Sequence, residues 1–230
     1  MGACAVTSSA RAYNLVEIDS AKATYFYDSD FWGLGNVTLS GSTLRFKPTG
    51  FSAHVEVTAP GDFQKDEQVY RGQASILAVA KSGYQFTQQT PNLSSARYNI
   101  SPDGEVFGAY LAETDIAHAG TYTGGIFVPD GSADVRSDSF GSALSSRGAS
   151  PVGNLYAGEP EIGLTGPKAL SFDTIFSLEV YRLDPGTADI ALNYATYKFT
   201  IDPVPEPQTY AMLLGGLILF GALARRRAPK

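Results

Sequence analysis

The chain has 230 residues, of which 43% are hydrophobic and only 17% are charged. Residues 13–203 hold 12 basic and 22 acidic side chains, a net charge of −10, so no nucleic-acid partner is expected, because such binding depends on Lys and Arg at phosphates. Cys4 is the one cysteine of the sequence. An internal disulfide framework and a cysteine-based zinc site are therefore both excluded within this chain.

Residues 1–12 are interpreted as the remnant of a truncated signal peptide. Ala10 and Ala12 form a small-x-small cleavage site that makes Tyr13 the first residue of the mature chain. An apolar stretch of about 7–15 residues should precede such a site, but residues 3–6 are all that this sequence provides. A disordered, uncleaved N-terminal segment is the alternative.

Residues 13–203 have the pattern of an all-β domain. Apolar residues alternate at residues 43–47 and at Val55 and Val57, and residues 191–201 are expected to form a long strand with one buried side. Turn signals at residues 40–42, 101–104, 129–131 and 184–186 separate such segments. About ten strands at this spacing predict an antiparallel β-sandwich, with jelly-roll or immunoglobulin-like topology. No helix is expected in this domain.

Residues 132–150 contain seven serines. This composition is typical of a solvated loop or a peripheral insertion.

Candidates for chemistry are few. His54 and His118 are interpreted as ordinary surface or core histidines, although a Ser-His-Asp triad stays an alternative because its members need not be close in sequence. Two acidic pairs, Asp28 with Asp30 and Glu113 with Asp115, are interpreted as hydrophilic turns. No cofactor is expected, and a calcium site built across several loops is the alternative.

Trp32 lies among aromatic neighbours in residues 25–34. Its expected role is core packing, since aromatic residues at alternate strand positions usually face the core. Stacking on sugars is the alternative.

The C-terminal segment, residues 204–230, is interpreted as a sorting and anchoring tail. It opens on Val204, Pro205, Glu206 and Pro207, where the two prolines favour an exposed, extended linker. Residues 210–224 are apolar and uncharged, and as a helix they would span roughly 22 Å, short against a hydrocarbon core of about 30 Å. Tyr210 and snorkelling arginines at the two edges extend this reach.

This tail is predicted to form one transmembrane helix. A buried core helix is the less favoured interpretation, because the helix over residues 210–224 would be apolar all round rather than amphipathic. Arginines after it stop translocation, so the C-terminus stays in the cytoplasm and the domain lies outside. The predicted anchor residues are Tyr210, Leu213, Leu214, Leu217, Ile218, Leu219, Phe220 and Leu223, and the stop-transfer residues are Arg225, Arg226 and Arg227.

The order of these elements resembles the PEP-CTERM sorting domain. The resemblance covers residues 204–230 only. It implies that a membrane-embedded cysteine protease-transpeptidase, exosortase, cuts at or near residues 205–207. It further implies transient anchoring in the inner membrane, with the domain in the periplasm, followed by release to the cell surface or to an extracellular exopolysaccharide matrix.

Three functions are therefore open at this point. The first is an exported, non-enzymatic surface or matrix protein with exosortase and exopolysaccharide as partners. The second is a carbohydrate-binding module, which an exposed row of Trp32 and tyrosines on one sheet would favour and burial of Trp32 would count against. The third is a secreted hydrolase, which a cleft that joins His54 or His118 to acids would favour and separation of the two histidines on opposite faces would rule out.

Overall fold

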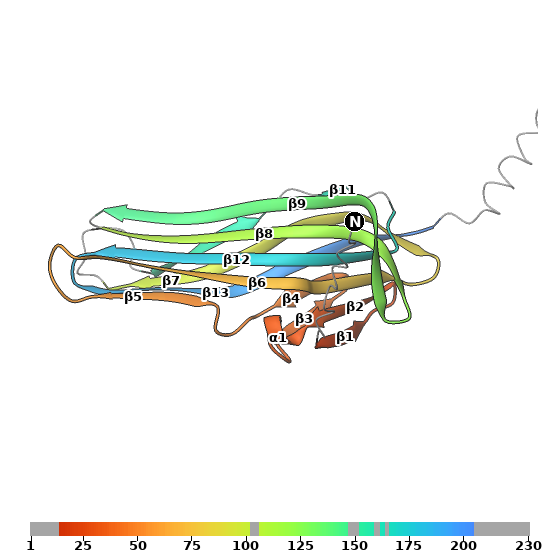
Figure 1. The fold of residues 1–230 in the computed structure, drawn as a ribbon, viewed down its shortest axis with the longest axis horizontal. Coiled ribbons are helices and arrows are strands. Elements are labelled where there is room, and N and C mark those ends of the chain that lie inside the picture. The colour runs from red at the N-terminus through yellow and green to blue at the C-terminus, as the bar shows by residue number, and fades with distance from the viewer. Residues whose placement is uncertain (1–13, 102–105, 147–151, 159–161, 164–165, 205–230) are drawn as a thin grey trace, which may run out of the picture.

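The computed structural model describes residues 14–101, 106–146, 152–158, 162–163 and 166–204. These residues form thirteen strands in two sheets, with one four-residue helix, α1 (Ser29–Trp32) (Figure 1). Every strand pairing is antiparallel. The prediction of an antiparallel all-β domain is thus confirmed, and α1 is a single turn. The expectation of about ten strands is corrected to thirteen among these residues.

The first sheet has six strands. In order across the sheet they are β1 (Leu15–Asp19), β2 (Ala23–Asp28), β6 (Phe63–Ala80), β12 (Ala169–Leu183), β8 (Val106–Thr123) and β9 (Ile126–Ser146).

The second sheet has seven strands. Its main path is β10 (Val152–Gly158), β7 (Tyr84–Ile100), β13 (Gly186–Pro203), β4 (Thr43–Phe46) and β3 (Val37–Ser40), with β5 (Ser52–Val57) also paired to β13 and β11 (Ile162–Gly163) paired to β7. The predicted strand at residues 191–201 is the later part of β13.

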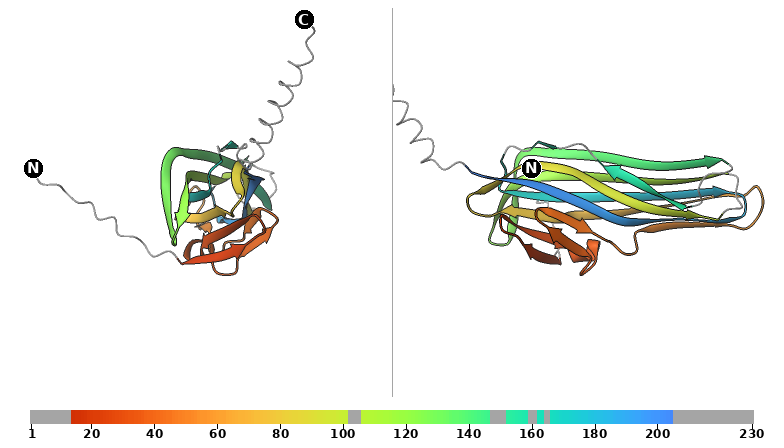
Figure 2. Two further views of the ribbon diagram at one scale, coloured as in Figure 1. Left: turned by 90° about the vertical axis from the view of Figure 1, so that its right-hand side faces the viewer. Right: turned by 180° about the vertical axis from the view of Figure 1, so that it is seen from behind.

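The domain is elongated along its longest strands. β9 has 21 residues, and β6, β8 and β13 each have 18, which corresponds to about 60 Å for 18 residues at the rise of an extended strand. The two sheets face each other along this length (Figures 1 and 2). β13 starts just after the turn that joins it to β12 and ends at the other extremity of the long axis (Figure 2).

The core between the sheets is rich in aromatic rings. Along most of β12 and β8 every second side chain is buried, as expected for strands with one face toward a core. Asp28 caps α1 by accepting a hydrogen bond from the backbone N–H of Asp30, and the helix delivers Trp32 to the core at 0% exposure. The Trp32 ring stacks on Phe46 with centroids 4.0 Å apart. The predicted core role of Trp32 is therefore confirmed.

Two turn and loop predictions are wrong. The β8–β9 hairpin turns at Gly124 and Gly125, both with positive φ (61° and 85°), the backbone that a two-residue hairpin favours. The chain therefore does not turn back at residues 129–131, because β9 continues through them. The serine-rich segment from residue 132 to 146 belongs to this same strand at the edge of the sheet. Its small polar side chains mimic a loop composition, but the ladder to β8 makes it a strand.

A buried arginine ties the turn between β12 and β13 to the end of β7. Arg182 is fully buried, and its guanidinium donates hydrogen bonds to the carbonyls of Asp184, Pro185, Ser101 and Thr187. The shortest of these, from Nη2 to the Pro185 oxygen, is 2.6 Å. Gly186 has φ of 130°, and a Cβ there would lie 2.4 Å from Nη2. The guanidinium therefore occupies space that only glycine leaves open.

We expect Arg182→Met to lower the free energy of unfolding by about 3 kcal/mol, because several partly buried carbonyls lose a charged donor. Urea unfolding followed by tryptophan fluorescence measures the change. Arg71→Met is the matched control, since Arg71 is exposed on β6 and such surface changes stay within about 0.5 kcal/mol. Equal effects of the two substitutions would show that the Arg182 bonds do not stabilise the fold.

Candidate functional site

The predicted sorting residues lie almost entirely outside the described residues. Val204 is the last residue described, and its backbone N–H donates to the carbonyl of Gly83 at 2.8 Å. Ala10 and Ala12, and all predicted tail residues from Pro205 onward, fall outside the described ranges. In the part of the chain that is described, no helix has the length and apolar character needed to cross a membrane.

The two histidines lie in different sheets. His54 is on β5 in the seven-stranded sheet, where its Nδ1 contacts Asp189. His118 is on β8 in the six-stranded sheet, and its Nε2 lies 3.4 Å from Asp173. Each histidine thus contacts a different aspartate, and the arrangement lends no support to a shared hydrolytic cleft.

The first acidic pair, Asp28 and Asp30, accepts hydrogen bonds from other groups of the chain. Asp28 caps α1, and both carboxylate oxygens of Asp30 accept hydrogen bonds from Asn14 Nδ2, at 2.9 and 3.0 Å. Across the described ranges, no group of three or more His, Cys, Asp or Glu side chains is placed to hold a metal ion.

For the second acidic pair, Glu113 and Asp115, the prediction of a hydrophilic turn is wrong. Glu113 and Asp115 lie within β8 with side chains toward the core, and each is 2% exposed. Two residues apart on a strand, they share one face because the side-chain period is two. The sequence places them in the same alternation as the apolar residues Leu111 and Ala117, which was the available signal.

These acids belong to a buried polar network that joins the two sheets. From β13, the Tyr197 hydroxyl lies 3.1 Å from both Glu113 Oε1 and Asp115 Oδ1. From β12, Thr174 Oγ1 donates to Asp115 Oδ1 at 2.6 Å. Ser75 of β6 donates to Thr174 Oγ1 at 2.9 Å, while its carbonyl accepts a hydrogen bond from Trp32 Nε1. We call these residues, Glu113, Asp115, Thr174, Tyr197 and Ser75, the core network.

Burial sets the protonation of the core network. Loss of water raises the pKa of Glu113 well above its ordinary value, and the neighbouring charge of Asp115 raises it further, since two close carboxylates resist carrying two charges. Burial likewise raises the pKa of Tyr197 well above its ordinary value. With 2% exposure, the two acids do not reach a substrate in solvent. The geometry therefore fits a brace inside the fold better than an acid-base pair for catalysis.

A row of aromatic side chains crosses the outward face of the six-stranded sheet. Tyr181 of β12 lies opposite Gly108 of β8 and Lys65 of β6. Phe63 lies two residues before Lys65 on β6, and Tyr110 lies two residues after Gly108 on β8, so both are diagonal neighbours of Tyr181 on the same face. On β9, Ser142 pairs with Tyr110, and Phe140, two residues before Ser142, continues the line. We call Phe63, Tyr181, Tyr110 and Phe140 the aromatic diagonal. No sequence pattern signalled it, since its members come from four strands.

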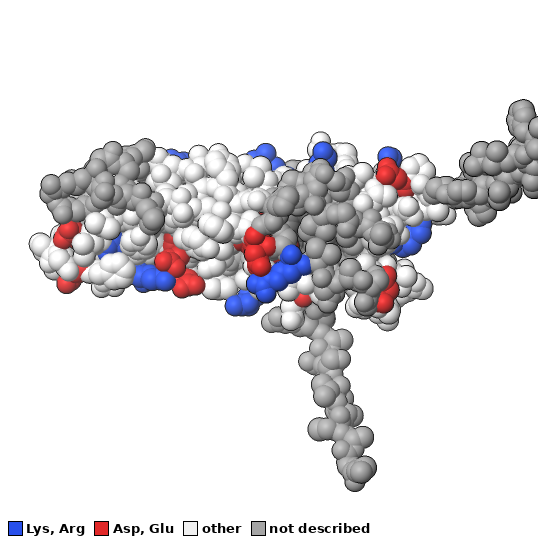
Figure 3. Space-filling view, turned by 90° about the horizontal axis from the view of Figure 1, so that it is seen from above, with Lys and Arg blue, Asp and Glu red and all other residues white. Residues whose placement is uncertain are grey.

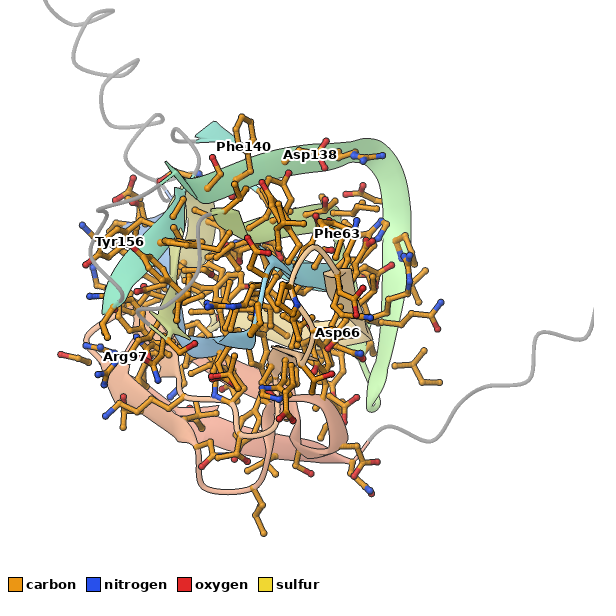
Figure 4. All side chains as sticks on the ribbon, turned by 90° about the vertical axis from the view of Figure 1, so that its left-hand side faces the viewer. Phe63, Asp66, Arg97, Asp138, Phe140 and Tyr156 are labelled. Atoms are coloured by element: carbon orange, nitrogen blue, oxygen red, sulfur yellow. The ribbon has the colours of Figure 1, made fainter. Side chains whose placement is uncertain are left out.

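The outermost rings of the aromatic diagonal are well exposed. Phe63 is 57% exposed and Phe140 is 70% exposed, and Phe140 projects away from β9 in the view along the strands (Figure 4). Ring centroids are 5.8 Å apart for Phe63 and Tyr181, and 6.1 Å apart for Tyr110 and Phe140. Exposed aromatic side chains gathered on one face are a feature of binding surfaces.

Each cation beside the aromatic diagonal is paired with carboxylates. Lys65 Nζ lies 2.8 Å from Glu179 and 3.4 Å from Glu67, and the guanidinium of Arg136 donates two hydrogen bonds to Asp138. Figure 3 shows small groups of mixed charge along one side of the molecule, a wide uncharged area in the middle, and further charged residues at the opposite edge and at one end. The face therefore presents rings and paired polar groups, with no block of one charge.

Comparison with known proteins assigns no family to the chain. No protein-family model and no curated protein matches it. Among solved structures, similarity is found to the Gx strain of infectious bursal disease virus, with 12% identity, TM-score 0.18 and coverage of 77% of this chain and 46% of that chain. The VP2 subviral particle of infectious bursal disease virus gives 10% identity, TM-score 0.15 and coverage of 79% and 50%. The chain thus spans about half the length of these structures, and TM-scores this low support no inference about it.

We expect the stability of the domain to fall as pH rises, through Glu113. The unfolded chain releases this proton near the ordinary glutamate pKa, whereas the folded domain keeps it to higher pH. The unfolding free energy should therefore fall between these two pKa values, by up to about 1.4 kcal/mol per pH unit. Urea unfolding between pH 5 and pH 8, at about one-unit steps, measures this slope.

Glu113→Gln removes the titrating group but keeps its size. The variant should show a flatter pH dependence than the parent and higher relative stability at the alkaline end of the range. Glu56→Gln, at an exposed position of β5, is the control and should keep the parental slope. A Glu113→Gln curve parallel to that of the parent would contradict the role given to this carboxyl.

Proposed function

We propose that the chain is an exported bacterial surface or extracellular-matrix protein whose domain is delivered by a removable C-terminal tail. The observation that carries the proposal is a backbone hydrogen bond at Val204, the last residue that the structure describes. Val204 bonds to Gly83, and the predicted cleavage residues Pro205, Glu206 and Pro207 follow at once. Cleavage there would remove none of the thirteen strands, so the released domain would keep its fold.

The position of this boundary also suits transient anchoring. β13 ends at one extremity of the long axis (Figures 1 and 2), so the segment that follows starts from an end of the domain and not from its flank. At the other end of the sequence, β1 starts at Leu15, two residues after the expected mature start at Tyr13. Removal of residues 1–12 would likewise leave every strand intact.

The proposal includes the transmembrane helix over residues 210–224, the stop-transfer arginines, exosortase as the processing partner, and the route from inner membrane to cell surface or matrix. It treats the domain as non-enzymatic. The jelly-roll and immunoglobulin-like assignments of the sandwich both stay predictions.

Carbohydrate binding is the second candidate function, and one observation favours it. Trp32 is buried, so it does not form the exposed aromatic row that this function needs. The aromatic diagonal supplies such a row from other residues, on one sheet. For the hydrolase candidate, the described residues offer no comparable feature, since His54 and His118 lie in different sheets.

We expect the mature protein in its native host to end near residues 204–207, and mass spectrometry of surface and matrix fractions reads this C-terminus directly. Glu206→Ala should slow processing and leave chains that still end at Lys230 in the membrane fraction. Asp202→Asn is the matched control, because this acid lies just before the cleavage region within β13, and it should be processed like the parent. Mature chains that end at Lys230 in every fraction would refute sorting through this tail.

A further inference from the structure

We propose that the aromatic diagonal is the binding face for an extended, uncharged glycan chain. Each step along it crosses one strand and advances two residues, as the registers of β6, β12, β8 and β9 show. With about 5 Å between strands and about 3.3 Å per residue, the three steps cover roughly 25 Å. That length suits a ligand of several sugar units in a line and exceeds what one small molecule needs.

The rings are held in an orientation suited to stacking. A Cβ at Gly108 would lie 2.2 Å from atoms of the Tyr181 ring, so this ring lies directly against the backbone of β8. One face of the ring therefore packs on the sheet, and the opposite face is turned outward. Sugar rings present C–H groups on one face, and such groups are attracted to the negative face of an aromatic ring.

Polar side chains flank the rings at the positions where sugar hydroxyls need partners. Glu179 lies opposite Tyr110 across the β12–β8 ladder. Thr114 and Asp138 are hydrogen-bonded to each other and lie next to Phe140 on β8 and β9. Their oxygens have more than one lone pair, so they can accept bonds from hydroxyls while they keep their present donors. Rings and carboxylates side by side thus offer both contacts that a hydroxyl-rich ligand requires.

The charges on this face select for an uncharged ligand. Lys65 is paired with Glu179 and Glu67, and Arg136 is paired with Asp138. A polyanion would find its cations already neutralised, and the domain as a whole is acidic. A second copy of the chain is a poorer occupant, because interface cores are depleted of charged residues, whereas these ion pairs stand among the rings.

The proposal concerns the domain and does not depend on the tail. Sorting is tested by determining the C-terminus of the mature chain, and glycan binding is tested with the purified protein. Either proposal can therefore fail while the other holds.

Affinity electrophoresis tests the binding face. The full-length chain is run in a mild non-ionic detergent through native gels that contain hydroxyethylcellulose, xyloglucan, dextran or alginate. We expect at least one of the three neutral polymers to retard the parent. Phe140→Ala and Tyr181→Ala should each weaken the apparent affinity tenfold or more. Gly108→Ala should weaken it as well, because the new Cβ displaces the Tyr181 ring while every ring stays present.

Tyr156→Ala is the matched control, since Tyr156 is 55% exposed but lies on β10 in the other sheet. The affinity of this variant for the polymer should stay within twofold of that of the parent. Circular dichroism checks that each variant is folded, and Phe140 is the safest position because its ring is mostly in solvent. The proposal is overturned if none of the neutral polymers retards the parent, if only alginate does, or if folded Phe140→Ala binds like the parent. Equal weakening by Tyr156→Ala would also overturn it.

Discussion

The hydroxyl of Tyr197 is the link on which the arrangement of the two sheets depends. It brings β13 of one sheet within hydrogen-bonding distance of Glu113 and Asp115 on β8 of the other. Buried carboxyl groups are costly unless they are bonded, so the network tolerates few other ways of stacking the sheets. Burial and the neighbouring charge of Asp115 raise the pKa of Glu113 well above its ordinary value, because two close carboxylates resist carrying two charges.

Polar contacts between the inner faces of the two sheets hold the strand register, so residues on the outer faces are not needed for this purpose. Apolar packing alone is non-directional, and long strands with alternating side chains can slip in register. The core network and the Arg182 bonds at the β12–β13 turn are directional and oppose such slips. A constant register is what lines up four aromatic rings from four strands, so the proposed binding face inherits its geometry from polar contacts in the core.

Some features of the structure can be predicted from the sequence, and for others the sequence pattern is misleading. Alternation of apolar residues identified the strands around residues 43–47 and 191–201, and the aromatic context of Trp32 indicated its place in the core. The Gly124-Gly125 pair is a hairpin signal in the sequence, and the chain reverses there and not at Pro129-Asp130-Gly131. The serine-rich edge strand could not be recognised from composition, because its partner β8 supplies the hydrogen bonds.

By itself the sequence determined the all-β class, the acidic character of the domain and the pattern of the tail, since each depends on local composition and spacing. Only the tertiary structure decided that Glu113 and Asp115 are buried beside Tyr197, that Arg182 bonds the turn carbonyls, and that four rings form one line. The physical reason is the same in each case. Each arrangement includes partners from distant parts of the chain, such as Tyr197 with Glu113 and Arg182 with Ser101. The environment of these groups, and hence their charge state and exposure, is set by strand pairing and sheet packing.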